Sequence, residues 1–288
     1  MPDIWEISSI VAKWLLYSGL TGATGIVMVR LVFWTHVEPL DARLRRFSLT
    51  LASLALIATI LSFLLRGAAL TGDLAGMVDR EMLGLLWTTS VGEAFTYRLA
   101  GVILIIVGLY LPIIGTWLSL FGGVIALWSF TQIGHIPDLD QTGIRMLLLL
   151  HLLGVSFWVG ILAPLHWLAR DPEYLEIAAN LGDHFGVMAS GIVAVLVLAG
   201  GFMAWLLLGS LSLVFTSAYG LALFGKVTLV ALLLGLAAAN KLRFIPGMKA
   251  GKQQAANHLI RSIELEFIVI ASVLIATATL TSVVSLPM

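Results

Sequence analysis

The sequence predicts an all-α integral membrane protein with eight transmembrane helices, and its composition and hydropathy pattern lead to this class. Hydrophobic residues make up 60% of the 288 positions, whereas charged residues make up only 11%. Most of the chain consists of apolar stretches of about 20 residues or more, the length at which a helix crosses about 30 Å of hydrocarbon. Because no water reaches the bilayer core, backbone groups there must bond within the helix, and buried polar side chains need a partner or a purpose.

The predicted spans follow one another closely along a single transmembrane domain, residues 1–288. The first apolar run is too long for the apolar region of a signal peptide and lacks an early basic cluster, so we expect a span. The third and fourth runs are separated only by Leu111 and Pro112, which predicts either a tight hairpin or one long interrupted segment. The predicted spans are residues 10–34, 47–70, 93–111, 113–130, 144–168, 185–208, 219–242 and 263–285.

The charges of the loops predict the orientation of these spans. The loops after the first and seventh spans are basic and are therefore expected in the cytoplasm, whereas loops 71–92 and 134–143 are acidic and are expected outside. The acidic loop 170–184 does not fit this rule. An even number of spans then places both termini outside. The basic residues that decide the orientation are Arg43, Arg45, Arg46, Lys241, Arg243, Lys249, Lys252 and Arg261.

Charge and composition exclude several classes of function. Basic and acidic residues balance at 16 each, so the chain has no basic face for nucleic acid, and its expected surroundings are the lipid bilayer. Cysteine is absent, which excludes disulfides and thiolate metal sites, so a soft metal would need His, Met or carboxylate ligands. The sequence has no phosphate-binding glycine loop, paired catalytic carboxylates or nucleophile elbow, and enzymatic activity is not predicted.

The two halves of the chain, residues 10–130 and 144–285, show a weak internal similarity. Each half has four predicted spans, so the copies would enter the membrane in the same sense and form a parallel 4+4 repeat, with a site near the repeat interface. Chance similarity between helices rich in Leu, Gly and Ala is the alternative explanation. The aligned pairs are Gly19 with Gly154, Gly25 with Gly160, and Arg98 with Lys226.

Two histidines near the outer side are the leading candidates for a metal site. His151 lies inside the fifth span, seven residues before Trp158, so both side chains share nearly one helix face. Neutral imidazole binds copper, zinc or haem iron and also relays protons, although a lone histidine in the membrane often only bonds a neighbouring helix. His135 follows the fourth span between Gly134 and Pro137, at an acidic mouth that would attract cations. An ordinary interfacial histidine is the alternative there.

Buried charges form a second group of candidates. Arg98 and Lys226 lie at a depth similar to that of His151, where a charge costs a few kcal/mol unless it pairs or reaches the surface. We expect these cations to have a structural or gating role; Glu93, five residues before Arg98, is poorly placed to pair with it along the helix.

The last group of candidates lies toward the cytoplasmic side. Glu264 and Glu266 open the eighth span, and because they are two residues apart only one can face inward. We expect that one to be Glu266, the deeper of the two. His166 lies near the inner end of the fifth span and is a candidate exit ligand or an interfacial residue. His36, His184 and His258 are expected to be solvated in cytoplasmic loops.

Several motifs together resemble the copper resistance D (CopD) family of bacterial inner-membrane proteins. The resemblance is specific from about residue 134 to the C-terminus and loose before it. The motifs are Gly134-His135, His151-Leu-Leu-Gly-Val-Ser-Phe-Trp158-Val-Gly160, Tyr219-Gly220 with Lys226, Ala238-Ala239-Asn240-Lys241 with Pro246, Arg261-Ser262-Ile-Glu264-Leu-Glu266, and Leu286-Pro287.

The resemblance implies copper transport across the inner membrane toward the cytoplasm, with copper supplied by a periplasmic copper-binding protein of the CopC type. Both termini would then be periplasmic. His135 would capture the ion, His151 would hold it, and Glu266 with His166 would mark the cytoplasmic side. The family members compared carry a histidine in the first span where this chain has Leu16, which bears on metal specificity.

Two other functions remain open on the sequence. A haem-binding electron-transfer protein would need two axial histidines at one depth, and only His151 lies deep. A non-transporting scaffold or sensor for a periplasmic copper protein would not need His151 at all.

Overall fold

A computed structural model describes residues 4–112, 114–134, 142–210 and 212–282. The described residues form helices and turns without a strand, which confirms the all-α class. The long helices are α1 (Ile4–Val32), α3 (Asp41–Thr71), α5 (Ser90–Tyr110), α6 (Gly115–Trp128), α7 (Thr142–Arg170), α8 (Leu175–Leu208), α10 (Ala218–Ala239) and α12 (Gln253–Leu280).

Shorter elements join these helices. They are α2 (Trp34–Val37), η1 (Glu38–Leu40), η2 (Leu74–Met77), α4 (Arg80–Trp87), η3 (Ser129–Thr131), η5 (Pro172–Tyr174), α9 (Leu213–Thr216), the π-helix η6 (Asn240–Phe244) and α11 (Ile245–Lys249).

Seven helical segments of the described chain are long and apolar enough to cross a membrane, and α6 with η3 is a shorter apolar helix beside α5. The helices correspond in order to the eight predicted spans. The largest differences in their bounds are at α8 and α12, each of which begins ten residues before its predicted span. Charged residues lower the hydropathy there, yet the helices continue beyond the apolar stretch.

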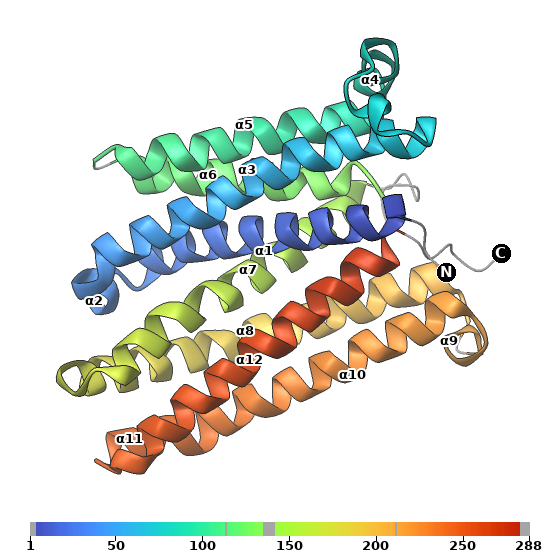
Figure 1. Cartoon of the computed structure of the whole chain (residues 1–288). Coiled ribbons are helices and arrows are strands. Elements are labelled where there is room, and N and C mark those ends of the chain that lie inside the picture. Colours follow the sequence, from blue (N-terminus) through green and yellow to red (C-terminus); the bar gives the residue numbers. More distant parts are fainter. Residues whose placement is uncertain (1–3, 113, 135–141, 211, 283–288) are drawn as a thin grey trace.

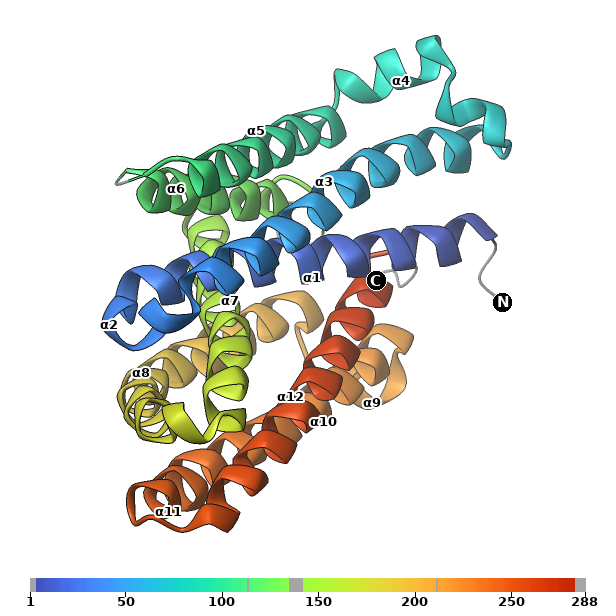
Figure 2. The ribbon, with the colours of Figure 1, turned by 60° about the vertical axis from the view of Figure 1, so that its left-hand side comes forward.

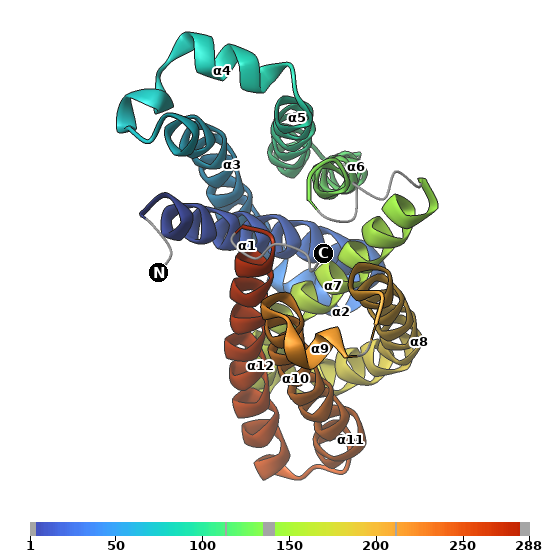
Figure 3. The ribbon, with the colours of Figure 1, turned by 90° about the vertical axis from the view of Figure 1, so that its right-hand side faces the viewer.

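The eight long helices form two groups, which we name the N-terminal bundle (α1, α3, α5 and α6) and the C-terminal bundle (α7, α8, α10 and α12) (Figure 1). Helix α1 begins and α12 ends at the same end of the molecule, here the terminal end, near α4 and α9. The opposite end carries α2 and α11 and is named the basic end. Because α1 begins and α12 ends at the same end, the chain would cross the membrane an even number of times. The view along the helices separates the two bundles clearly (Figure 3).

The bundles meet where α7 crosses α1 (Figure 2). A Cβ atom on Gly25 would lie 1.8 Å from the carbonyl oxygen of Ser156, and one on Gly160 would lie 2.1 Å from the carbonyl carbon of Gly25. The two backbones therefore touch, and only glycine fits at either position. Gly25 and Gly160 are an aligned pair of the predicted repeat, and contact between equivalent residues is the geometry of a two-fold axis. The repeat itself stays a prediction.

The hydrophobic core follows the same division. One cluster of buried side chains lies within the N-terminal bundle and includes Leu16, which is 1% exposed. A larger cluster joins the basic half of α1 to α7, α8 and α12. The helices of the C-terminal bundle are thus anchored to α1 along α7 and α12.

Candidate functional site

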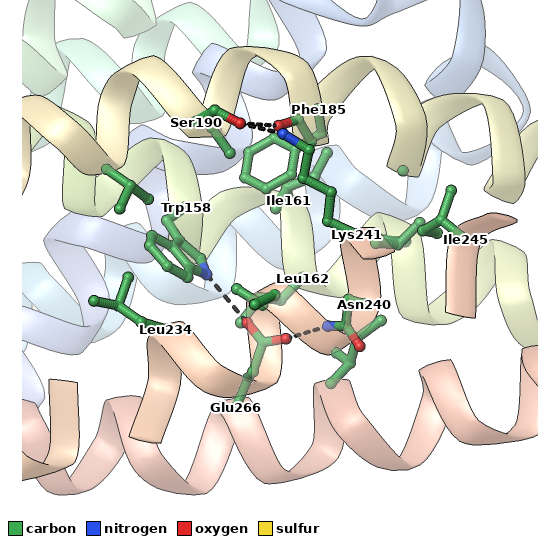
Figure 4. A pocket seen from close by; sticks show the side chains of 18 residues that line it. Trp158, Ile161, Leu162, Phe185, Ser190, Leu234, Asn240, Lys241, Ile245 and Glu266 are labelled. Atoms are coloured by element: carbon green, nitrogen blue, oxygen red, sulfur yellow. Dashed lines mark hydrogen bonds between the residues drawn. The ribbon is translucent and has the colours of Figure 1, made fainter. Parts of the chain in front are cut away.

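A cavity of about 220 Å³ lies inside the C-terminal bundle, in its half nearer the basic end. Side chains of α7, α8, α10, α12 and the η6–α11 segment form its wall (Figure 4). The lining is mainly aliphatic and aromatic. Its polar groups come from Trp158, Ser190, Asn240, Lys241 and Glu266. A mostly apolar cavity with a few converging polar groups is the usual form of a small-ligand site.

Glu266 is the most deeply buried charged residue of this cavity and is only 1% exposed. Its Oε2 accepts a hydrogen bond of 3.1 Å from the indole Nε1 of Trp158, and its Oε1 accepts one of 2.5 Å from the Nδ2 of Asn240. Burying a carboxylate costs several kcal/mol unless such donors compensate for lost water. The three residues hold an acidic group inside the membrane-spanning bundle.

The π-helix η6 explains how Asn240 reaches Glu266. Pro246 has no N–H to continue the α-helical ladder, and the N–H of Ile245 bonds the carbonyl of Asn240 five residues back. The wider turn places Asn240, Lys241 and Ile245 on the cavity wall together. Single π turns inside α-helices occur frequently at functional sites. The Oδ1 of Asn240 is buried and has no hydrogen-bond partner among the described residues.

Lys241 brings a cation to the opposite wall of the cavity (Figure 4). Its ammonium donates a hydrogen bond to the Oγ of Ser190 on α8. Its alkyl chain passes Gly186, where an added Cβ would lie 3.4 Å from the Cγ of the lysine. The cavity therefore contains a carboxylate on one side and an ammonium on the other.

His151 lies on the same face of α7 as Trp158, about 10 Å nearer the terminal end at about 1.5 Å per residue. Its ring faces α8, where a Cβ on Gly200 would lie 3.5 Å from the Cε1 of the histidine. The Nδ1 is buried without a hydrogen-bond partner among the described residues. A buried nitrogen without a partner is unusual in a folded protein, and on a neutral imidazole it can bind a metal ion.

The structure separates the two glutamates of α12 as predicted, with one inward and one outward. Glu264 is 46% exposed and its Oε1 lies 3.1 Å from both the Nε2 of His166 and an Nη2 of Arg170. His166 therefore contacts the exposed carboxylate of Glu264 at the basic end and does not line the cavity. Its predicted function as an exit ligand stays a prediction.

The predicted structural charges lie near the terminal end. Arg98 donates a 2.9 Å hydrogen bond from its Nε to the Oγ of Ser129 and lies over the ring of Phe130, 4.9 Å from its centroid. Glu93 is exposed on the first turn of α5, and Lys226 is half-buried on α10. His135 lies outside the described residues.

Sequence reasoning missed two features of this region. Asn240 was not expected to bond Glu266; the Asn-Lys-Leu-Arg-Phe-Ile-Pro segment, with its proline, was the available signal. The loop positions predicted for His36, His184 and His258 are wrong, because these residues lie in α2, α8 and α12, although His184 and His258 are exposed as expected. The imidazoles of His36 and His184 face each other at 3.2 Å. Helix α8 begins before the apolar stretch that marked its span, and it carries His184 with it.

Within the described ranges, no group of three or more His, Asp or Glu side chains is placed to hold one metal ion. The described residues also bring no second histidine to the level of His151, as two axial haem ligands would require.

Comparisons with known proteins agree with the motifs. Residues 1–140 match the family model described as copper resistance protein D-like, N-terminal domain, and residues 179–280 match copper resistance protein D. Copper resistance protein D of Pseudomonas syringae pv. tomato is 27% identical over 261 residues, which cover 84% of this chain and 83% of that protein.

No solved structure matches the chain significantly. The family models and the relative support a role in copper resistance or transport. This multi-pass membrane protein belongs to the copper resistance protein D family.

Proposed function

We propose that the protein conducts copper across the bacterial inner membrane toward the cytoplasm, as cargo and without catalysing a reaction. The basic loops at the end that carries α2 and α11 favour a cytoplasmic location for that end. Copper would then enter at the terminal end, where we expect the mouth with His135 and where both termini would be periplasmic. A periplasmic copper-binding protein of the CopC type would deliver it there.

One observation carries this proposal: buried Glu266 lies at a cavity wall and is joined to the α7 face that also bears His151. A cation inside hydrocarbon needs compensating charge, and a buried carboxylate supplies it. Burying a carboxylate lowers the stability of the fold, and a well-packed apolar residue would stabilise the bundle equally well. A purely structural role is therefore a poor explanation for Glu266.

The order of the polar groups gives a route. A neutral His151 would hold the ion through its unpartnered Nδ1. The next polar group on the same face is Trp158, whose indole bond to Glu266 would have to open before a carboxylate oxygen could face the ion. The Oδ1 of Asn240 is a further oxygen at the same level. A route with so few ligands suits Cu(I), which accepts low coordination numbers.

Copper accumulation in cells tests this proposal. Cells that express the protein should accumulate copper, and His151→Ala and Glu266→Gln should each reduce accumulation to the level of the empty vector. Glu264→Gln is the matched control, because it removes an acidic side chain two residues away that lies outside the cavity. Membrane levels of all variants are matched by immunoblot. Wild-type accumulation in both His151→Ala and Glu266→Gln would overturn the proposal.

A further inference from the structure

Two histidines, one in the short helix after α1 and one in the C-terminal bundle, face each other at the basic end. His36 lies in α2, which follows α1, and His184 lies in α8. The Nδ1 of His184 is 3.2 Å from the Nε2 of His36, and the ring centroids are 5.0 Å apart. The pair joins residues 148 positions apart in the chain. His36 is half-buried and His184 exposed, so water and solutes reach the pair.

The neighbouring side chains leave the two facing nitrogens available. The Nδ1 of His36 lies 3.1 Å from the Oγ1 of Thr35, which can accept its hydrogen and so direct the Nε2 lone pair toward His184. Asp183, next in the chain, is bound to the ammonium of Lys249 at 2.5 Å. The carboxylate nearest in sequence is thus engaged elsewhere, and the pair offers two nitrogen donors.

An aromatic cluster connects this pair with the cavity. Phe185 lines the cavity, and its ring centroid lies 5.6 Å from that of Phe157 and 6.5 Å from that of Phe33. The ring of Phe33 lies 6.3 Å from that of His36. Ring contacts therefore lead from the cavity wall at Phe185 through Phe33 to the imidazole of His36.

We propose that His36 and His184 form a two-coordinate binding site for monovalent copper. Imidazole is a good copper ligand, and Cu(I), which has a filled d shell, can be bound by only two nitrogens on opposite sides. A zinc site normally takes four ligands, and the described residues offer no third His, Asp or Glu here. The inference rests on the proposed function in that the pair would receive copper leaving the cavity for the cytoplasm.

Binding of Cu(I) to the neutral histidine pair requires no base to take up a proton and no redox partner. In the unbound neutral pair, one facing nitrogen carries the hydrogen that the other accepts. The ion replaces this hydrogen, which moves to the far nitrogen of the same ring, so the neutral pair releases no proton. With each metal–nitrogen bond near 2 Å, the facing nitrogens must separate to about 4 Å. A short helix and an exposed side chain permit this small movement.

The test is a titration of the purified full-length protein with Cu(I) without oxygen, in competition with a coloured chelator. His36→Ala and His184→Ala should each weaken binding about tenfold or more, and the double variant should be little worse than either, since one imidazole alone does not make the site. His258→Ala is the matched control, because this histidine also lies near the basic end but stacks on Phe244. It should leave the titration unchanged.

A second variant keeps the test decisive if the alanine variants fold poorly. His184→Met replaces one ligand by a thioether that suits Cu(I) and should keep the affinity near that of the wild type. X-ray absorption of the loaded wild type should show two nitrogen ligands, with one sulfur in His184→Met. Unchanged affinity in both alanine variants, or zinc binding as tight as Cu(I) binding, would overturn the proposal.

Binding and transport can fail separately. If copper accumulation is absent but the pair binds Cu(I) as described, the transport proposal fails and the site remains. If cells accumulate copper while His36→Ala and His184→Ala bind Cu(I) like the wild type, the site is refuted and transport stands.

Discussion

The N-terminal and C-terminal bundles have the same number of long helices but differ in how much of their apolar helix surface the rest of the protein covers. In the N-terminal bundle α1 has 67% of its most apolar segment buried, whereas in the C-terminal bundle α10 has 6%. Helices α5 and α6 touch through Gly101, where an added Cβ would lie 2.5 Å from the Gly122 carbonyl oxygen. On α10, a Cβ at Gly235 would meet nothing within 4 Å.

The polar side chains of the two bundles also have different partners. In the N-terminal bundle, Arg30 pairs with Asp41 at 2.7 Å and Arg98 bonds Ser129. The C-terminal bundle keeps a cavity, a buried carboxylate and the unpartnered Nδ1 of His151. The N-terminal bundle also has a pocket of about 320 Å³, beside Arg30 and Asp41, and buried polar atoms on Trp14 and Thr59 without a partner among the described residues. What distinguishes the C-terminal bundle is the buried carboxylate of Glu266 at its cavity wall, which under the proposed function would serve the passage of an ion.

The largest effect is expected where the bundles meet. Gly160→Leu would push a branched side chain into the backbone of Gly25 and should cost about 3 kcal/mol or more, enough to prevent a stable fold. The yield of monodisperse protein in size-exclusion chromatography measures this. Gly235→Leu is the control on an open helix face and should be tolerated. Equal yields of the two variants would show that the bundles do not depend on this crossing.

An intermediate effect separates stability from transport in the C-terminal bundle. Glu266→Leu combined with Asn240→Leu and Trp158→Phe replaces all three hydrogen-bonding side chains by apolar ones, which should leave the melting temperature within a few degrees of the wild type. Copper accumulation should nevertheless be lost. Thermal melting and accumulation are measured on the same preparations of cells and membranes. A large fall in melting temperature would mean that these polar residues hold the bundle together.

The smallest effect is expected in the N-terminal bundle. Ser129→Ala removes the acceptor for the Nε of Arg98 and should destabilise the protein by about 1 kcal/mol, with copper accumulation unchanged. The shift of the melting temperature relative to wild type measures the first, and uptake at matched expression the second. Loss of accumulation without loss of stability would place Arg98 on the transport route.

The all-α membrane class was predictable because apolar runs of sufficient length have few alternatives to a transmembrane helix. The choice of Glu266 over Glu264 as the inward residue also followed from helix geometry and depth. The partners of Glu266 did not, because Trp158 is 108 residues away and Asn240 reaches it through a π turn that no periodicity reveals. The contact of His36 with His184 depends in the same way on how two bundles dock.

Because of the π-helix η6, the shape of the cavity depends on the number of residues in this segment. Removing one residue from it would turn the segments on its two sides by about 100° relative to each other. Asn240 or Ile245 could then line the cavity, but not both. Such a deletion would keep both helices and nearly all of their hydropathy, yet it would dismantle one wall of the cavity. In this part of the protein, the number of residues matters as much as their identity.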